Sequence, residues 1–348
     1  MDLAKWLLKS LTLCSFWICI TASDFKFYWN IPTFMCAKYQ IKFDTLQTEY
    51  GIVHNQNNTF RGDQVSILYD PGNFPAILQN TSSNEFFYRN HGVPQEGNLS
   101  EHLQLFESQL EELIPDTNFS GIAIIDFESW RPVYRQNFGT LKPYKILSMQ
   151  IEQKNHPRWS KKQIENEAEM NFEIGGKTFM LETLLTAKRL RPNAKWGYYA
   201  FPYCFNNGIN PEKCARGVPE ENNIIQWMFK SSDAIFPSVY LQEKIPPLNR
   251  MPLIRGRVIE ALRVANYQNK GRKRPQVLVY HRYLYTDTLK YIDIGTTFEM
   301  FNEVKRQGAD GVILWGSSYD LDSRIKCQEF QMYVKEQLGP AVRLVSIR

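Results

Sequence analysis

Short apolar runs alternate with helical patterns along almost the whole chain, and this feature restricts the possible folds most. Most runs are continuously apolar rather than alternating, which is typical of parallel strands covered on both faces. They lie at residues 25–29, 65–69, 121–126, 145–149, 196–199, 235–240, 277–283 and 311–315. Repeated alternation of strand and helix predicts an α/β fold that closes, or nearly closes, into a barrel. A doubly wound open sheet is the alternative, but the glycine-rich first turn typical of it is not visible.

The helical patterns lie between these runs. Asn98 followed by Glu101 predicts a capping box, which opens a helix with Leu103, Phe106 and Leu110 on one face. Residues 161–189 are long and periodic, and Gly175-Gly176 is a predicted break. Further helices are expected at residues 221–229, 254–266, 298–306 and 321–338. No internal repeat and no Pro- or Ser-rich linker interrupts the series, so we expect a single domain.

The first 23 residues have the pattern of a secretory signal peptide. Lys5 and Lys9 precede or flank an apolar stretch at residues 11–20, and the small residues of 21–23 follow it. The stretch is too short to span a bilayer, which needs about 20 apolar residues, and no later segment qualifies. We therefore expect an exported domain, residues 24–348, with no membrane anchor.

The cysteines support an exported protein. Cys14 and Cys19 belong to the signal peptide, and four cysteines remain at positions 36, 204, 214 and 327. An even number in an exported chain predicts disulfides, and four cysteines allow three pairings. We favour Cys204–Cys214, which closes a short loop, together with Cys36–Cys327, which ties the ends of the domain together. A zinc site is the alternative, but no CxxC or HxxxH spacing supports it, and no metal is expected.

Surface features complete this picture of an exported domain. Sequons for N-glycosylation occur at Asn57, Asn80, Asn98 and Asn118, each a candidate glycan site in an exported protein. The formal net charge is +5, which suits a polyanionic partner. Basic residues cluster at positions 270–274, where we predict a solvated loop before a strand rather than a nucleic-acid site.

Two acids follow the apolar run that ends near residue 125. Asp126 and Glu128 are two positions apart, so both side chains of an extended segment point to the same side. Two carboxyls held close together cannot both ionise easily, and one pKa should rise. A protonated acid beside an anionic one is the combination that glycosidases use. We expect Arg131 to pair with one of the carboxylates and lower its pKa. The alternative is a pair of solvated loop acids that cap the next helix.

Aromatic residues stand at the ends of other predicted strands, where chemistry gathers in α/β barrels. Tyr199, Tyr240 and Trp315 occupy such positions, and Tyr69 precedes Asp70 at another. Aromatic rings stack on the flat C–H faces of sugars. Packing in the core is the alternative for any one of them. No GxSxG, HExxH or GxxxxGK motif is present, and the histidines are scattered singly, so other hydrolytic and phosphate chemistries are disfavoured.

The segment around the acids, residues 124–132, resembles the signature of the hyaluronidases, particularly those of bee and wasp venom. The similarity continues at residues 29–36, 67–72, 92–98, 196–204, 314–318 and 338–341, and so covers nearly the whole mature chain. It implies a distorted TIM-like (β/α) barrel of about seven strands, with the two disulfides Cys36–Cys327 and Cys204–Cys214. It also implies a lone catalytic domain, because only a short segment follows Cys327.

The resemblance further implies an endo-β-N-acetylhexosaminidase that cleaves the β-1,4 linkages of hyaluronan without a cofactor. Glu128 matches the acid that protonates the glycosidic oxygen. Asp126 matches the residue that holds the substrate's N-acetyl group, whose carbonyl is the nucleophile, and Tyr240 assists it. The matching groove residues are Tyr69, Arg131, Tyr199 and Trp315. Secretion into venom or saliva, as a monomer, is the corresponding expectation.

This chain departs from the venom pattern at two places. Ala37 follows the first cysteine where venom members commonly carry histidine, and residues 279–283 replace a strand rich in tryptophan and tyrosine and add Arg282. Two other functions remain open. The chain could be an exported hyaluronan-binding homologue or allergen without turnover, although both acids are present. It could also act on chondroitin, whereas a basic groove gains nothing from neutral chitin.

Overall fold

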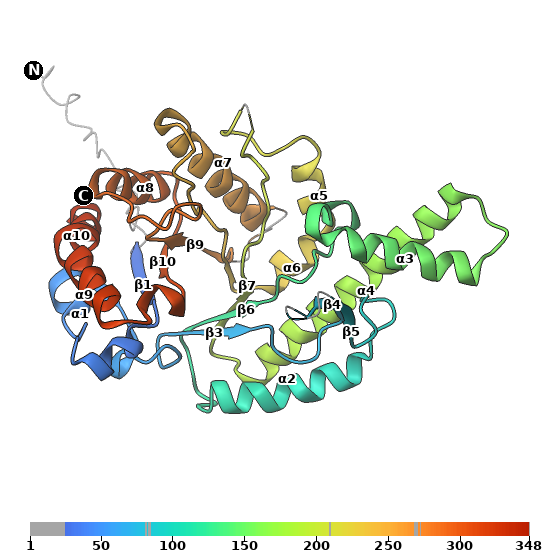
Figure 1. Ribbon diagram of the computed structural model, residues 1–348, viewed down its shortest axis with the longest axis horizontal. Helices are drawn as coiled ribbons and strands as arrows, with labels where there is room; N and C mark the ends of the chain where they lie inside the picture. Colours follow the sequence, from blue (N-terminus) through green and yellow to red (C-terminus); the bar gives the residue numbers. More distant parts are fainter. Residues whose placement is uncertain are drawn as a thin grey trace, which may run out of the picture.

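The computed structural model describes residues 25–80, 82, 85–208, 210–267, 271 and 273–347. The predicted signal peptide, residues 1–23, lies outside these described residues. Two parallel sheets form the centre of the molecule (Figure 1). The larger sheet has the order β2-β1-β10-β9-β8, made of Ile52–Val53, Lys26–Asn30, Gly311–Trp315, Gln276–Arg282 and Ala234–Ile235. The smaller sheet has the order β3-β6-β7, made of Val65–Tyr69, Ile122–Asp126 and Lys195–Tyr198.

The two sheets adjoin at both sides. Just beyond β7 and β8, Tyr199 and Phe236 form a parallel bridge. On the other side β1 lies next to β3. All paired strands of the two sheets run in the same direction, so their carboxyl ends lie at one face of the molecule. The side chains of strand-end residues are therefore brought together there.

Helices cover the outside of the sheets (Figure 1). They are α1 Leu46–Tyr50, α2 Leu99–Leu113, α3 Lys142–Asn155, α4 Lys161–Leu190, α5 Val218–Ile224, α6 Gln226–Ser231, α7 Pro247–Asn266, α8 Ile294–Arg306, α9 Arg324–Tyr333 and α10 Gly339–Ile347. Short helical turns lie at η1 Thr33–Tyr39, η2 Gln56–Asn58, η3 Tyr134–Gln136, η4 Gly139–Leu141, η5 Ser318–Leu321 and η6 Val334–Leu338. Among the described residues, no helix is both long enough and apolar enough to cross a membrane. The predicted α/β class and single domain are confirmed.

The predicted strand at residues 145–149 is wrong, because these residues lie inside α3. Tyr144, Ser148 and Glu152 are the buried positions of this helix, and their four-residue spacing is helical. Pro143, in the first turn, is well suited to a helix start. A run of five residues, three of them apolar, was too short to distinguish a strand from a helix.

The predicted break at Gly175-Gly176 is also wrong, since α4 continues from residue 161 to 190. Both glycines instead allow close packing. A Cβ on Gly175 would lie 2.7 Å from the backbone nitrogen of Gln95, and one on Gly176 would lie 3.2 Å from the Trp130 ring. The helix therefore carries glycine where another segment approaches its backbone, and the rest of its hydrogen bonds keep it intact.

The predicted capping box at Asn98 is half correct. The Asn98 side chain accepts a hydrogen bond from the backbone nitrogen of Glu101 at 3.1 Å and caps α2. Glu101 does not return the bond, because its carboxylate accepts from the Asn73 side chain at 2.9 Å. The backbone nitrogen of Asn98 donates to Asn90 instead. Asn73 thus replaces the backbone nitrogen of Asn98 as the hydrogen-bond donor to the Glu101 carboxylate.

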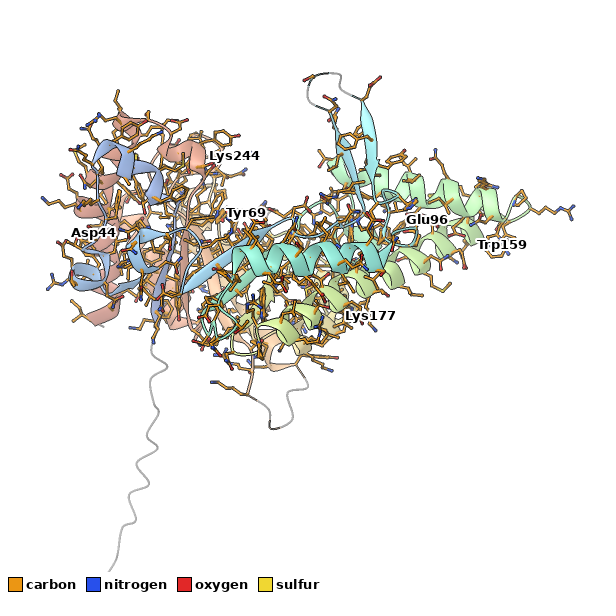
Figure 2. All side chains as sticks on the ribbon, turned by 90° about the horizontal axis from the view of Figure 1, so that it is seen from below. Asp44, Tyr69, Glu96, Trp159, Lys177 and Lys244 are labelled. Atoms are coloured by element: carbon orange, nitrogen blue, oxygen red, sulfur yellow. A yellow bond between two sulfur atoms is a disulfide. The ribbon has the colours of Figure 1, made fainter. Side chains whose placement is uncertain are left out.

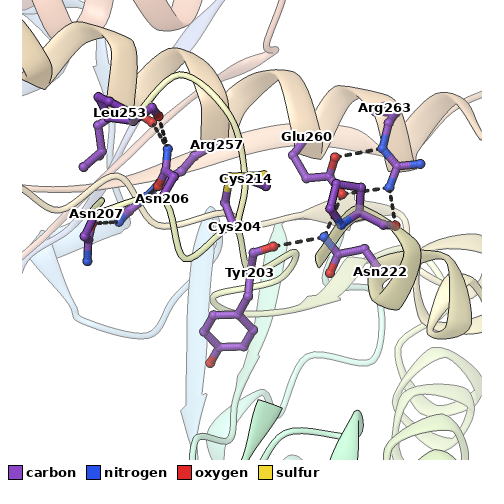
Figure 3. The surroundings of a disulfide bond; sticks show 12 residues. Tyr203, Cys204, Asn206, Asn207, Cys214, Asn222, Leu253, Arg257, Glu260 and Arg263 are labelled. Atoms are coloured by element: carbon purple, nitrogen blue, oxygen red, sulfur yellow. Dashed lines mark hydrogen bonds and ion pairs between the residues drawn. A yellow bond between two sulfur atoms is a disulfide. The ribbon is translucent and has the colours of Figure 1, made fainter. Parts of the chain in front are cut away.

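Both disulfides form as favoured, Cys36–Cys327 between η1 and α9 and Cys204–Cys214 in the loop after β7. The second disulfide lies in a network of polar contacts (Figure 3). Asn222 donates to the carbonyl of Tyr203 at 2.9 Å, and Asn206 donates to the carbonyl of Leu253 in α7 at 2.9 Å. These bonds fix the loop, and with it the position of the Tyr203 ring. The zinc alternative fails because all four cysteines are oxidised.

Two smaller expectations concern the later strands. The predicted strand at 235–240 is shorter, since β8 ends at Ile235 and only the isolated bridges at Phe236 and Ser238 follow. Pro237 cannot donate a ladder hydrogen bond, which explains the interruption. Of the predicted basic loop 270–274, residues 270 and 272 lie outside the described part. The described remainder precedes β9 without strand or helix, as expected.

A buried histidine on β9 should make the fold sensitive to acid. His281 is 1% exposed, its ring contacts Phe301 edge-on at 4.9 Å, and neither ring nitrogen has a partner among the described residues. Burial lowers its pKa from 6.5 to about 3. Between these values the unfolded chain binds a proton that the native chain does not, so stability falls as the pH falls from about 6.5 toward 3.

We therefore expect His281→Leu to reduce the acid sensitivity of the fold. The difference between the melting temperatures at pH 7.5 and pH 4.5 should be smaller in the variant than in the unmodified protein. His102, whose pKa burial also lowers to about 3, is unchanged in both proteins and cancels in the comparison. Equal differences in the two proteins would show that His281 does not carry this effect.

Candidate active site

The two acids lie at the end of β6, the central strand of the smaller sheet. Asp126 is the last residue of β6 and pairs in register with Tyr69 of β3. Its carbonyl accepts a hydrogen bond from the backbone nitrogen of Asp70 at 2.7 Å, which holds the two strand ends together. Asp126 is half-buried, Phe127 is buried in the core, and Glu128 is exposed. The two carboxyl groups meet in a side-chain hydrogen bond.

A hydrogen bond between two carboxyl groups requires that one of them carry the proton. Burial and the neighbouring charge of Glu128 raise the pKa of Asp126 to about 8, and Asp70 adds to the effect. Burial also raises the pKa of Glu128, although the hydrogen bond from Asp126 and the charge of Arg131 act in the opposite direction. The pair therefore holds one proton at neutral pH and shares it between the two groups.

Arg131 does not form the predicted ion pair. Among the described residues its guanidinium donates to the carbonyl of Gln136 at 2.7 Å, and its Nε has no partner. Three aromatic rings surround it, with centroids at 4.5 Å for Tyr203, 5.3 Å for Phe138 and 5.1 Å for Phe205. The positive charge still lowers the pKa of Glu128. Arg131 thus lowers the pKa of Glu128 as expected, but it does so without forming an ion pair.

Four aromatic residues form one cluster beside the acids. The Trp315 indole nitrogen donates to the Tyr69 hydroxyl at 2.8 Å, and the Trp315 ring stacks on Tyr240 with centroids 5.7 Å apart. Tyr199 hydrogen-bonds to Tyr240 through its side chain. All four lie at or beyond the ends of strands, as the sequence predicts. The cluster is neither wholly core nor wholly surface, since Tyr199 is 9% exposed and Tyr69 is 42% exposed.

The tyrosines of this cluster stay protonated at physiological pH. Burial raises the pKa of Tyr69 to about 12, and it raises the pKa values of Tyr199 and Tyr240 as well. The negative charge of the acids acts in the same direction on all three. Their hydroxyl groups are therefore neutral and can donate hydrogen bonds to a ligand or an anion at the acids.

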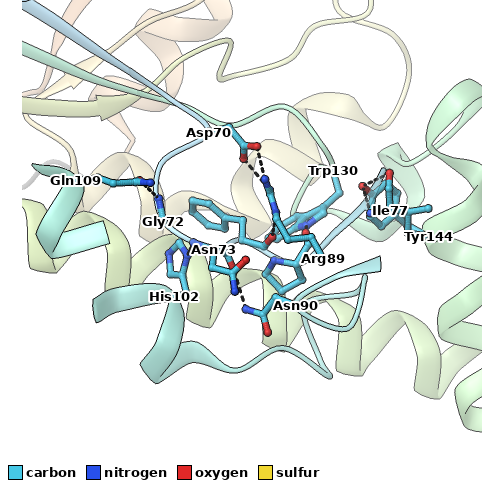
Figure 4. Close-up of polar contacts among 12 residues, drawn as sticks. Asp70, Gly72, Asn73, Ile77, Arg89, Asn90, His102, Gln109, Trp130 and Tyr144 are labelled. Carbon is cyan, nitrogen blue, oxygen red and sulfur yellow. Dashed lines mark hydrogen bonds and ion pairs between the residues drawn. The ribbon is translucent and has the colours of Figure 1, made fainter. Parts of the chain in front are cut away.

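One charged pair beside the acids was missed. Both terminal nitrogens of Arg89 bind the carboxylate of Asp70, at 2.5 and 2.8 Å (Figure 4). Asp70 raises the pKa of Asp126, so the pair belongs to the electrostatics of the site. Asp70 could have been found, because it directly follows a strand end. Arg89 could not, because it lies in a hairpin that the sequence pattern did not reveal. Tyr203 was missed for a similar reason, since its place depends on the folded loop.

The remaining predicted site residues lie on the surface. Asn57, Asn80, Asn98 and Asn118 are all exposed, as glycan acceptors need to be. Within the described part of the chain, no three His, Cys, Asp or Glu side chains gather as a metal site would require. The chemistry available at the strand ends is therefore that of two carboxyls sharing a proton, phenolic hydroxyl donors and aromatic rings.

Carboxyl pairs with one proton, next to aromatic surfaces that can stack on sugars, are the equipment of glycoside hydrolases. The comparisons with known proteins specify the class further. The family model described as hyaluronidase matches residues 16–348. The chain belongs to the hyaluronidase family, as the resemblance of its motifs predicted.

Individual relatives agree with this assignment. The chain is 49% identical to "Hyaluronidase Tab y 2.0101" of Tabanus yao over 91% of this chain and 91% of that protein. It is 45% identical to a hyaluronidase of Apis mellifera, over 94% of this chain and 86% of that protein. Among solved structures it resembles bee venom hyaluronidase in complex with a hyaluronic acid tetramer. That match has a TM-score of 0.90 and 44% identity, and it covers 93% of this chain and all of the other.

Proposed function

We propose that this protein hydrolyses the β-1,4 linkages of hyaluronan by a substrate-assisted mechanism that retains the anomeric configuration. The observation that carries this proposal is the hydrogen-bonded, partly desolvated pair Asp126 and Glu128 at the end of β6. The family membership and the hyaluronic acid tetramer in the bee venom relative support the choice of polymer.

The closeness of the two acids supports substrate assistance. Inverting enzymes separate their carboxyls by roughly 6.5–9.5 Å to admit a water, and retaining enzymes with a carboxylate nucleophile separate them by about 5–5.5 Å. Two carboxyls that share a hydrogen bond are closer than either arrangement. Two carboxyls in direct contact match neither of these arrangements. The nucleophile must then come from elsewhere, and the N-acetyl carbonyl of the substrate is the group available.

The roles of the two acids follow from their surroundings. Glu128, the more exposed of the two, donates its proton to the glycosidic oxygen. Asp126, half-buried below it, accepts a hydrogen bond from the N–H of the substrate's N-acetyl group and stabilises the positive charge that develops there. An N–H donor at Asp126 favours its anionic form, so substrate binding moves the shared proton to Glu128. Tyr240 holds the carbonyl of the same group through its neutral hydroxyl.

The aromatic cluster shapes the groove in this proposal. Tyr69, Tyr199 and Trp315 supply ring surfaces and hydroxyl donors for the sugars on either side of the scissile bond. The Arg131 guanidinium, which lies among aromatic rings, attracts the glucuronate carboxylates of hyaluronan. Its buried Nε, which has no partner among the described residues, remains free to donate to such a carboxylate.

We also propose that the parallel strands form a distorted barrel of about seven strands and that the chain is exported as a mature domain starting at residue 24. The bridge between Tyr199 and Phe236 and the packing of β1 beside β3 support closure on both sides. The disulfides and the four exposed sequons support an extracellular, glycosylated protein, with venom or saliva as the secretion.

Digestion of hyaluronan by the purified protein tests the proposed function. We expect the polymer to be cut internally, so that its mean size falls well before small products accumulate. Chondroitin in a parallel reaction measures the selectivity between the two polymers. Unchanged hyaluronan in the presence of a folded sample, at any pH between 4 and 8, would refute the activity, and tight binding without cleavage would identify a binding homologue instead.

A further inference from the structure

An exposed aromatic hairpin projects from the body of the molecule (Figure 2). It consists of β4, Ala76–Gln79, and β5, Phe86–Arg89, paired antiparallel. Phe86, Phe87 and Tyr88 are 58%, 51% and 57% exposed. Exposing three consecutive large aromatic side chains to solvent does not help the chain to fold. Exposed apolar patches of this kind commonly mark binding sites.

The two faces of this hairpin have different surroundings. Side chains alternate along a strand, so Phe87 and Arg89 share one face with their register partners Leu78 and Ala76. Phe86 and Tyr88 occupy the other face. Tyr88 lies with Leu147 of α3 around Gly92, and the backbone nitrogen of Ile77 donates to the Tyr144 hydroxyl of α3 at 2.9 Å. The face of Phe86 and Tyr88 is therefore the face toward α3.

The face of Phe87 is connected to the active site. Arg89, two residues further along this face, binds Asp70 with both terminal nitrogens (Figure 4). The backbone nitrogen of Asp70 in turn donates to the carbonyl of Asp126 at 2.7 Å. A series of neighbouring residues therefore leads from Asp126 over the Asp70–Arg89 pair to Phe87. The pair has no net charge, so a polyanion following this path meets no unpaired carboxylate at Asp70.

We propose that Phe87, together with Leu78, is an outlying sugar-stacking site for the part of the hyaluronan chain that leaves the groove past Asp70. This inference rests on the proposed function. The flat C–H face of a pyranose matches the exposed ring of Phe87.

Kinetics of two neighbouring variants test this site. Phe87→Ala should raise the KM for polymeric hyaluronan roughly fivefold and leave kcat unchanged, because a contact remote from the scissile bond contributes equally to ground state and transition state. Phe86→Ala is the matched control, since it removes an equally exposed ring from the opposite face, and its KM should stay within about 1.5-fold of the unmodified protein. Phe87→Tyr keeps the ring and should restore the KM.

A glycan on Asn80, at the end of β4, is the competing occupant of the Phe87 ring. The measurements are therefore repeated with Ser82→Ala, which removes the sequon but keeps Asn80. The Asn80 side chain accepts a hydrogen bond from the backbone nitrogen of residue 82 at 2.9 Å, and this substitution leaves both groups in place. The KM effect of Phe87→Ala should persist in this background.

Two outcomes would overturn the inference while the proposed function stands. One is an equal KM in Phe87→Ala, Phe86→Ala and the unmodified protein, and the other is an effect that disappears with the sequon. Thermal unfolding checks that the exposed substitutions leave the fold intact. Inactivity of the unmodified protein on hyaluronan would refute the proposed function itself, and the outlying site with it.

Discussion

Replacing Glu128 by glutamine is expected to abolish most hydrolysis while leaving the fold unchanged. Glutamine keeps the shape of the side chain but has no proton to give to the glycosidic oxygen. General acid catalysis typically contributes about 10²- to 10⁴-fold, so kcat should fall by at least that range. Product size after incubation with hyaluronan measures the loss, and circular dichroism measures the fold.

The control for this variant is Glu111→Gln, which removes an exposed glutamate from α2. It should have full activity. The melting temperature of Glu128→Gln should equal or slightly exceed that of the unmodified protein, because the raised pKa of Glu128 shows that its charge is held at a cost. Substantial remaining turnover in Glu128→Gln would mean that another group protonates the leaving oxygen.

Replacing Asp126 by asparagine is expected to cause the second large loss of activity. Asparagine cannot carry the negative charge that stabilises the reacting N-acetyl group, and the loss of one such electrostatic contact typically costs about 10²- to 10³-fold in kcat. Because the substrate's ring contacts remain, KM should change little. Steady-state kinetics on hyaluronan, with Asp116→Asn in the exposed loop after α2 as the matched control, measure this effect.

The pH profile of the same two proteins tests the coupling between the acids. In the unmodified protein the pair loses its remaining proton with a pKa of about 8, so activity should fall as the pH rises through about 8. In Asp126→Asn the group with this raised pKa is absent, and Glu128 titrates beside a neutral amide. The alkaline limb of the residual activity should therefore move to lower pH. An unshifted limb would show that the two carboxyls titrate independently.

The sequence predicted the α/β class and the strand ends well, because both depend on local periodicity. β6 and β10 were expected within a residue of their observed bounds, and Asp126 and Trp315 were placed at their ends. The errors arise where local pattern is ambiguous. Residues 145–149 lie in a helix whose buried positions are four residues apart, and Gly175 allows a close approach from residues 94–95 that no local pattern records.

In the candidate site, too, features that depend on local spacing were predicted, and features that depend on the folded chain were not. Asp126 and Glu128 could be placed together because their spacing along an extended chain fixes their common side. The aromatic contacts between Trp315, Tyr69 and Tyr240 could not be derived, because they join strands distant in sequence. Arg131 illustrates the limit most clearly. Its proximity in sequence suggested an ion pair, but Tyr203 and Phe205, brought in by the loop that Cys204–Cys214 closes, surround it instead.

The stereochemistry of the first product tests the mechanism most directly. Proton NMR of a fresh digestion of hyaluronan oligosaccharides resolves the anomeric signal of the newly formed reducing end before it equilibrates. Participation of the substrate's N-acetyl group beside two hydrogen-bonded acids predicts that the β anomer appears first and the α anomer only later. Initial appearance of the α anomer would mean that water attacks directly from the opposite face, and the assignment of Asp126 and Glu128 given above would be wrong.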